Sequence, residues 1–300
     1  MPEITKEIQL DPSVIPPLDP SLLSLSEQEK EFLHATISSD DEALKKKVYE
    51  VQKIAYAQHA YPCIRAFHFV NLMMSENPIY PRVLEAGKGG NTLLLDLGCC
   101  MGTDVRKLVY DGYPANRVIG CDLRQDFIDQ GYHLFGDKDT SPIRFFTGDI
   151  FDVPVKLAEP SGIVQVDTFK ITGLEQLRGA LTHFYAGALF HLFDEPTQYE
   201  LACRVATLVK LEPGTVVFGR HQALPEERLI DDHLGRTRYG HSPQSWAKLW
   251  IKVIGELRSP EFAESHVKVE AFLNEGFNVH VFQARHQTHM LVWSIKSPRL

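Results

Sequence analysis

The chain has 300 residues, of which 44% are hydrophobic and 23% are charged, and its formal net charge at pH 7 is −8. This composition is ordinary for a globular protein with a sizeable core, whereas the acidic balance argues against a general nucleic-acid binder, which displays a basic face. No apolar run approaches the ~20 residues of a membrane-spanning helix, and the polar, acidic start of the chain is unlike a secretory leader. We therefore expect a cytoplasmic protein with no membrane span and no nucleic-acid partner.

Residues 1–80 are predicted to form an N-terminal arm and a helical cap, beside a main domain at 81–300. Proline and acidic residues at 1–25 favour an extended arm, and two helices are expected next, one from about 24 and one after 40. The apolar segment 63–74 favours a buried helix. Four aromatic residues of the cap could line an apolar substrate or simply pack in the core: Tyr49, Tyr56, His59 and Tyr61.

The sequence TLLLDLGCCMG at 92–102 is the first chemical signal. A short apolar run that ends in Asp96 is typical of a strand buried on both faces, and open α/β sheets bind ligands at the carboxyl ends of such strands. The glycines Gly98 and Gly102 bound a tight turn, and Thr103 with Asp104 offers N-cap chemistry for a following helix. Strand, turn and helix together indicate a nucleotide-binding crossover.

Two further acids follow at the spacing of one βα unit. Asp122 ends a second apolar strand 26 residues after Asp96 (122 − 96), and Asp149 follows a third strand 27 residues later (149 − 122). An acid at the end of the second strand commonly binds a ribose hydroxyl pair. Asp149 and Ile150 suit an adenine, because a carboxylate can accept from the exocyclic amine while an apolar side chain covers the ring.

The ligand of this site is expected to carry no phosphate. A dinucleotide loop needs G-x-G-x-x-G, but Cys100 stands at the middle glycine, and no P-loop Gly-Lys-Ser/Thr follows. Three acids without a convergent Lys or Arg would repel a phosphate. S-adenosylmethionine fits better than a dinucleotide, so a dinucleotide oxidoreductase is the weaker alternative.

These motifs resemble the class I S-adenosylmethionine-dependent methyltransferases, from about residue 92 to the last strands near 297. LDLGCCMG resembles the family's first motif with its middle glycine replaced, and CDL at 121–123 and GDI at 148–150 resemble the ribose and adenine motifs. The resemblance implies a mostly parallel Rossmann-like sheet closed by an antiparallel strand. It implies the following cofactor-binding residues: Asp96, Gly98, Cys99, Gly102, Asp122, Leu123, Asp149, Ile150 and Phe151.

A narrower resemblance is to the fungal carboxyl O-methyltransferases of meroterpenoid pathways. It is carried by YPCIRAFHFV (61–70), LVYDGYPANRVIGCDLRQDFIDQGYHLFGD (108–137) and YGHSPQSWAKLW (239–250). It implies a carboxylate substrate on a terpenoid-like molecule and a methyl ester product. Related small-molecule methyltransferases often form homodimers, and this chain offers a cap and an insertion at about 221–262 for such a contact.

The second half of the chain is predicted to continue the alternation of helices and strands. Helices are expected at 174–181, 198–210, 243–254 and 264–275, and strands at 183–191, 215–220, 278–284 and 289–295. The last two strands would close the sheet as an antiparallel pair.

Methyl transfer is an in-line displacement that requires an aligned, desolvated nucleophile. A carboxylate is already ionised at pH 7, whereas a phenol would need a general base. The candidate substrate residues near the strand ends are His191, Arg220, His221 and His241. Arg220 could hold a carboxylate bidentately or pair with Glu226 or Glu227 on the surface.

The remaining chemical signals are weaker. His286 and His289 are expected in the closing hairpin, and the histidines show no HxH or HExxH spacing, so no metal is expected. Five cysteines, an odd number, indicate a reducing compartment, and Cys99 with Cys100 is either a redox pair or a filler of the tight turn. The alternatives to a carboxyl methyltransferase are a phenolic O-methyltransferase and a non-catalytic methyltransferase-like binding protein.

Overall fold

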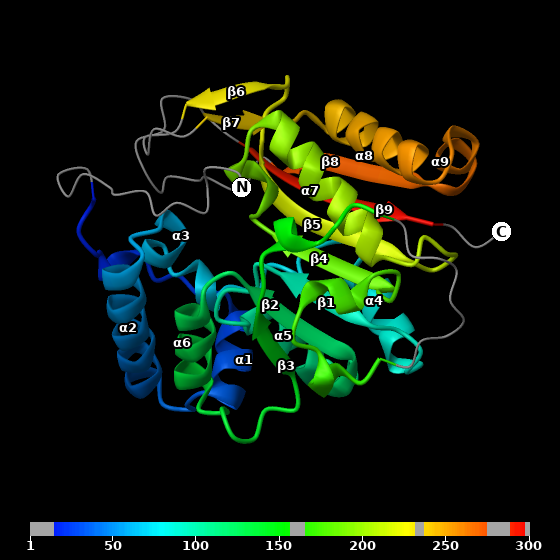
Figure 1. Cartoon of the computed structure of the whole chain (residues 1–300). Coiled ribbons are helices and arrows are strands. Elements are labelled where there is room, and N and C mark those ends of the chain that lie inside the picture. Colours follow the sequence, from blue (N-terminus) through cyan, green and yellow to red (C-terminus); the bar gives the residue numbers. More distant parts are fainter. Residues whose placement is uncertain (1–14, 157–165, 232–236, 275–288, 298–300) are drawn as a thin grey trace.

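A seven-stranded sheet forms the centre of the computed structural model, which describes residues 15–156, 166–231, 237–274 and 289–297 (Figure 1). Its strand order is β3-β2-β1-β4-β5-β9-β8. The first five strands in this order are parallel, and β9 pairs antiparallel with both β5 and β8. The strands are β1 (Leu94–Leu97), β2 (Val118–Asp122), β3 (Arg144–Thr147), β4 (His183–Gly187), β5 (Val216–Ala223), β8 (Lys268–Asn274) and β9 (His289–Lys296). The expected Rossmann-like sheet with an antiparallel edge is confirmed.

The strand register brings the expected acids to one edge of the sheet. Every residue of β1 and β2 is buried, as their uninterrupted apolar runs predict. Asp96 lies opposite Gly120 on one side and Tyr185 on the other, and Asp122 lies opposite Thr147. The carboxyl ends of β1, β2, β3 and β4 therefore meet along one line.

Helices cover both faces of the sheet. Figure 1 shows α7 (Glu195–Leu208), α8 (Pro243–Leu257) and α9 (Pro260–His266) on one side, and α5 (Thr103–Tyr110) and α6 (Gln125–Phe135) on the other. With α4 (Tyr80–Lys88), the second group packs on Leu94, Val118 and Phe218. The first group packs on the opposite strand faces around Phe184, Val217 and Trp293. Alternation of side chains along each strand builds both cores from the same sheet.

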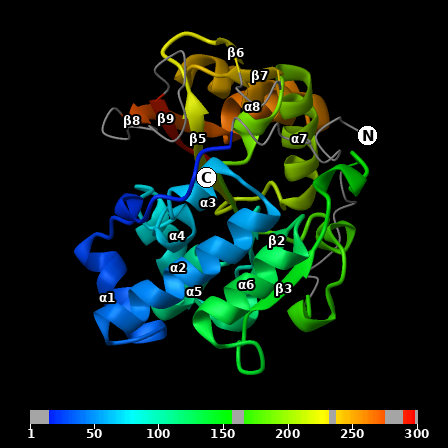
Figure 2. The same ribbon diagram turned by 90° about the vertical axis from the view of Figure 1, so that its left-hand side faces the viewer.

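The cap packs on α6 and shares a hydrophobic core with it. It consists of α1 (Glu27–Thr36), α2 (Asp41–Gln58), α3 (Pro62–Arg65) and the 3-10 turn η4 (His68–Val70). Ser26 begins α1 with a reciprocal capping box to Glu29. Phe127 and Leu134 of α6 contact the cap's apolar side chains, and both views place α2 beside α6 (Figures 1 and 2).

Several expected elements differ in the structure. The segment predicted as a helix at 264–275 contains the last residues of α9 and then strand β8, whose residues alternate between exposed and half-buried. Val269, Ala271 and Leu273 lie on the inner face, a period of two that the helical interpretation overlooked. Pairing with β9 determines the strand. The expected strand at 278–284 lies outside the described residues.

Three other predictions were too long. The expected strand 183–191 ends at Gly187, because Ala188 takes a left-handed φ of 59° and a 3-10 turn, η9 (Phe190–Leu192), follows. The expected helix 174–181 is only the 3-10 turn η8 (Leu174–Leu177), and the segment 63–74 contains only the short α3 and η4.

The insertion contains a small hairpin in addition to α8. Strands β6 (Arg228–Asp231) and β7 (Thr237–Gly240) pair antiparallel. The remaining 3-10 turns are η3 (Pro20–Leu22), η5 (Ala115–Arg117), η6 (Ile150–Asp152) and η7 (Thr168–Lys170). Among the described residues, no helix combines the length and apolar character needed to cross a membrane.

Candidate cofactor and substrate site

The loop after β1 is tied to the neighbouring strand by backbone hydrogen bonds. Gly98 and Cys99 both donate their N–H to the carbonyl of Cys121, at 2.8 and 3.1 Å. A Cβ at Gly98 would meet only Leu189 Cδ1 at 3.9 Å, whereas one at Gly102 would lie 2.5 Å from the Phe145 ring. Gly102 therefore serves close packing, and Gly98 keeps its backbone open toward the end of β4.

Cys100 makes the turn that a glycine usually makes. Its φ is 52°, in the left-handed region that disfavours residues with a Cβ. Phe67 and Ala188, at φ 60° and 59°, have the same conformation before η4 and after β4. Strained residues of this kind are enriched at functional sites. Cys100 thus holds a left-handed conformation that glycine would adopt freely, and it places a side chain in the loop.

Asp122 is buried and holds this loop. One carboxylate oxygen accepts the Cys100 N–H at 2.7 Å and the other accepts the Arg124 N–H at 2.9 Å. Burial raises the pKa of Asp122, and these backbone donors oppose that rise. Each carboxylate oxygen has a second lone pair, so the group keeps capacity for further donors.

The residues expected around an adenine occupy different environments. Leu123 has 47% of its surface exposed, which is unusual for a leucine, beside the buried Asp122. Asp149 accepts the Phe151 N–H at 2.9 Å and so caps η6. Ile150 is buried in the main core, and the Phe151 ring packs edge-on against Phe193. Leu123 is thus the apolar surface in this group that solvent reaches most.

Thr103 and Asp104 bind the cap instead of capping their own helix. The N-cap of α5 is Gly102, without a side-chain cap bond, so the expected capping role is wrong. Thr103 donates its hydroxyl to the Phe69 carbonyl, and Asp104 accepts the Met74 N–H at 2.9 Å. These bonds join the cap segment that contains Phe69 and Met74 to the start of α5.

Three carboxylates, a tyrosine and an arginine lie close together where β1, β4 and β5 meet α5 and the cap. We call them the acid–arginine cluster: Asp96, Asp104, Tyr185, Arg220 and Glu76. Burial, and then the charges of Asp104 and Asp122, raise the pKa of Asp96. Burial raises the pKa of Asp104 to about 7, although the Met74 N–H and Arg220 oppose the rise. The buried Tyr185 hydroxyl has no hydrogen-bond partner among the described residues.

Arg220 is buried within β5, opposite the last residue of β4, and pairs with the cap. Its Nη1 lies 3.4 Å from Oε2 of Glu76, and among the described residues it pairs with neither of the expected Glu226 and Glu227. Glu227 instead accepts the Ser242 hydroxyl at 2.6 Å. The charge of Arg220 also lowers the pKa of His68, although burial is the larger cause, and that pKa is about 4.

His221 follows Arg220 on β5 and therefore points to the opposite face of the sheet, because successive strand residues alternate between faces. His221 accepts the Trp293 indole N–H at 2.9 Å through Nδ1, which places the proton of a neutral ring on Nε2. Burial, together with His191 and His241, lowers the pKa of His221. Burial also lowers the pKa of His241 to about 4. These are neutral rings in an aromatic cluster around Trp246.

The four cap aromatics make structural contacts. Tyr56 donates its hydroxyl to the Pro16 carbonyl at 2.8 Å, and Tyr49 packs on Phe67. His59 lies 2.7 Å from Asp126 of α6 and stacks on Tyr61. Of the two hairpin histidines, His289 begins β9 and His286 lies outside the described residues.

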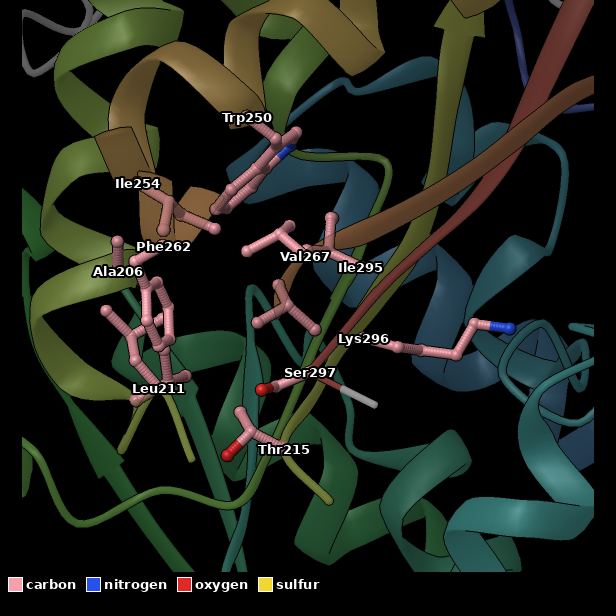
Figure 3. Close-up of a pocket in the computed structure, with 12 residues that line it drawn as sticks. Ala206, Leu211, Thr215, Trp250, Ile254, Phe262, Val267, Ile295, Lys296 and Ser297 are labelled. Carbon is pink, nitrogen blue, oxygen red and sulfur yellow. The ribbon is translucent and has the colours of Figure 1, made fainter. Parts of the chain in front are cut away.

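An apolar pocket lies at the other end of the sheet (Figure 3). It is bounded by Thr215, which precedes β5, by Ser297 after β9, and by Trp250 and Phe262 of α8 and α9. None of the residues that line this pocket belongs to the acid–arginine cluster, so the two are separate. In the described part of the chain, no group of His, Cys, Asp or Glu is arranged to hold a metal ion, and the five cysteines are free thiols.

Sequence reasoning missed three residues of the cluster. Tyr185 sits in the middle of an apolar strand, and Glu76 lies in a segment without periodicity. Asp104 was noticed only as a helix cap. Their common signal is tertiary, because β1, β4, β5 and the cap segment approach one another only in the fold.

The sheet order, the acids that end β1 and β2 and the glycine-bounded loop define a class I S-adenosylmethionine-dependent methyltransferase. Two family models match the chain: a meroterpenoid methyltransferase N-terminal domain over residues 18–70, and a methyltransferase domain over residues 94–204. The chain belongs to the meroterpenoid methyltransferase family. The resemblance stated from its motifs is thereby confirmed.

Characterised fungal relatives are similar over most of the chain. The asnovolin E/chermesin D methyltransferase nvfJ of Aspergillus novofumigatus is 33% identical over 207 residues, 69% of this chain and 68% of the relative. The methyltransferase ausD of Penicillium brasilianum is 34% identical over 208 residues, with the same two shares. The O-methyltransferase phiE of a fungal species is 33% identical over 208 residues, and this chain spans 64% of its length.

A solved structure is also similar. A Burkholderia thailandensis 1,6-didemethyltoxoflavin N1-methyltransferase with bound S-adenosylhomocysteine matches with a TM-score of 0.44 and 12% identity. The match covers 84% of this chain and 89% of that one.

Proposed function

We propose that this chain transfers the methyl group of S-adenosylmethionine to the carboxylate of a small apolar acid, giving a methyl ester and S-adenosylhomocysteine. The observation that carries the proposal is a buried arginine, Arg220, which lies on β5 opposite the last residue of β4 and close to the buried Asp104. The match to the meroterpenoid methyltransferase N-terminal domain model supports a terpenoid-like acid.

The residues around the loop fit this cofactor. The open backbone at Gly98 and the exposed Leu123 offer room and an apolar surface for an adenosine, and Asp122 keeps lone pairs for ribose hydroxyls. Burial raises the pKa of Asp96, and raises that of Asp104 to about 7, so a cationic group beside them is favoured and a phosphate is disfavoured. When bound, the cofactor supplies an electrophilic methyl group on a sulfonium. In this proposal Asp149, Ile150 and Phe151 border the adenine, with Cys99 and Gly102 shaping the loop.

Arg220 supplies the recognition of the substrate. A guanidinium can hold a carboxylate by two parallel N–H bonds, which orients the nucleophile without withdrawing a proton that is already absent. Alignment and exclusion of water then provide the rate enhancement. His221 and His241 pack around Trp246 on the face of the sheet opposite Arg220, so in this proposal they support β5 from behind and do not contact the acid. In this proposal His191, in η9 shortly after β4, borders the substrate.

A phenolic substrate is the second candidate, and one observation favours it. Asp104 has a pKa raised to about 7, which is suitable for a general base that accepts a phenol proton near neutral pH. The pH dependence separates the two. A carboxylate substrate needs no base, so its rate should change little between pH 6 and pH 8, while a phenol rate should rise as Asp104 ionises.

The first experiment is calorimetric titration of the protein with S-adenosylmethionine, S-adenosylhomocysteine and NAD. We expect binding of both sulfur ligands and none of NAD; NAD binding alone would reject the proposal in favour of an oxidoreductase. Turnover is then measured on paired terpenoid acids and phenols. Tight cofactor binding without turnover on either class would support a non-catalytic binding protein.

The substrate role of Arg220 has its own test. Arg220→Lys keeps the charge but loses the bidentate geometry, at a cost of roughly 1.5–3 kcal/mol, so KM for the acid should rise about tenfold to a hundredfold. Cofactor affinity should stay unchanged, and its loss in this variant would indicate a structural role instead. The expected homodimer is tested on the same preparations by light scattering.

A further inference from the structure

The hydrophobic core of the cap is built on both segments that flank the proposed cofactor site. Met101, from the loop after β1, lies in this core, Cys100 packs against it, and Phe127 of α6 belongs to it. Gly131 brings α6 close to the same loop, since a Cβ there would lie 2.3 Å from the Met101 carbonyl oxygen. A displacement of the cap would therefore disturb the loop and α6 together.

His59 makes a polar contact between the cap and the first turn of α6. It is the C-cap residue of α2, and its Nε2 lies 2.7 Å from Oδ2 of Asp126. The two side chains are 15% and 26% exposed, so salt and water screen this pair less than an open surface pair. The imidazole also stacks on Tyr61 and meets the Phe127 ring edge-on, with centroid distances of 5.5 and 5.3 Å. The ring is thus held in place, and Nε2 carries the proton because a carboxylate only accepts.

The first turn of α6 follows directly on the acid proposed to bind the ribose. Asp122 accepts the N–H of Arg124, which is the N-cap residue of α6 and makes no side-chain cap bond itself. Burial is the largest cause of the raised pKa of Asp122, and the charge of Asp126 adds to it. The donor on His59 offsets part of that repulsion by pairing with Asp126. The contact with the cap therefore helps to fix the backbone between Asp122 and Asp126.

A second pair joins the same two helices away from this acid. His133 of α6 lies 3.1 Å from Oε1 of Glu50 on α2, and these side chains are 43% and 50% exposed. His133 comes seven residues after Asp126 (133 − 126), which is two turns along the same face, or about 10 Å. Both views show α2 beside α6 (Figures 1 and 2). The cap thus holds α6 near both of its ends, and of these two pairs the one at His59 lies beside Asp122.

We infer that His59 is a positioning residue for the cofactor: through Asp126 it holds the start of α6, so docking of the cap and binding of S-adenosylmethionine support each other. This inference rests on the proposed function, which places the ribose at Asp122, and it adds a residue of the cap to that site. The coupling is reciprocal, so the bound cofactor in turn holds the cap in place. A cap held in this way helps to exclude water during methyl transfer.

The test separates the hydrogen bond from the packing of the ring. His59→Phe keeps an aromatic ring and removes the donor, whereas His59→Gln keeps a donor near the position of Nε2 and removes the ring. By calorimetry we expect the dissociation constant for S-adenosylmethionine to rise about fivefold to tenfold in His59→Phe and to stay within about twofold in His59→Gln. His133→Phe, the matched change in the exposed pair, should bind the cofactor as the wild type does.

Two results would overturn the inference. One is an unchanged dissociation constant in His59→Phe, even if urea denaturation shows a loss of stability, because the pair would then be structural only. The other is an equal rise in His59→Phe and His133→Phe, which a general loosening of the cap would explain. Asp126→Ala removes the same bond from the other side, so combining it with His59→Phe should weaken binding no further than either change alone. Full additivity would contradict a shared bond.

Hydrogen exchange without any ligand keeps this inference apart from the proposed function. His59→Phe should speed the exchange of backbone amides at 98–102 and 122–127, whereas His133→Phe should leave them as in the wild type. If His59→Phe does not fold, Asp126→Ala carries both measurements. A protein that binds no S-adenosylmethionine rejects the proposed function, and the exchange result then decides alone whether His59 positions these segments; unchanged exchange would mean that it does not.

Discussion

The Asp122 carboxylate accepts a hydrogen bond from the Cys100 backbone N–H at 2.7 Å. The acid that ends β2 thus also holds the loop that follows β1. This contact joins the acid that we propose to bind the ribose to a left-handed residue that is not glycine. The loop can therefore dispense with its middle glycine, because a buried carboxylate supports the conformation that Cys100 must adopt.

Removing the Asp122 carboxylate should weaken cofactor binding. Asp122→Ala loses the acceptor for the ribose and the support of the loop, and a charge-assisted bond contributes roughly 1.5–3 kcal/mol. We expect a rise in the dissociation constant for S-adenosylmethionine of about tenfold or more by calorimetry. Asp129→Asn, an exposed site on α6, is the control and should bind normally. Unchanged affinity in Asp122→Ala would contradict the ribose assignment.

The loop conformation predicts how Cys100 tolerates substitution. Cys100→Gly should fold with nearly the wild-type free energy of unfolding, because glycine adopts φ 52° freely while adding chain entropy to the unfolded state. Cys100→Val should lose about 1–2 kcal/mol, since a β-branched residue fits this region poorly. Urea denaturation measures both. Equal stability of the two variants would show that the left-handed turn is not retained.

Asp104 should make stability fall as pH rises. Its pKa in the folded protein is about 7 against an ordinary value of 3.8, so the folded state binds a proton more tightly than the unfolded state. The contribution is therefore complete below about pH 4 and is lost as pH rises to about 7. Asp104→Asn removes this dependence.

The comparison is made by urea denaturation of both proteins at pH 5, 6, 7 and 8. We expect the difference in unfolding free energy, variant minus wild type, to increase with pH. The buried histidines titrate in both proteins and cancel in that difference. A difference that is constant across this range would mean that Asp104 is ionised throughout.

The bond from Trp293 to His221 should contribute to stability and leave cofactor binding unchanged. Trp293→Phe leaves Nδ1 of a buried histidine without its donor, which costs about 1–3 kcal/mol, and removes part of a buried ring. Denaturation should show the loss, while calorimetry should show normal S-adenosylmethionine affinity. Combining Trp293→Phe with His221→Phe should recover part of the stability, since both polar partners are then gone. If the loss of stability in the double variant equals the sum of the losses in the two single variants, the result would argue against the bond.

The sequence by itself determined the nucleotide-binding half of this protein. Buried apolar strands, glycine turns and the spacing of Asp96, Asp122 and Asp149 are local properties. Parallel strands must bring their carboxyl ends to one edge, so three acids at βα spacing meet wherever the helices pack. The same local rules predicted the helices of the cap, whose apolar residues repeat at helical spacing.

Contacts between distant segments produce the acid–arginine cluster and the closing strand. Glu76 and Arg220 are 144 residues apart, and their contact depends on the cap segment that Asn77 and Asp104 fasten to the sheet. The segment at 268–274 becomes a strand because β9 supplies its hydrogen bonds. Burial against Trp293 likewise determines the proton position on His221. Pairing and burial between distant segments produce these features, and a local period carries no information about them.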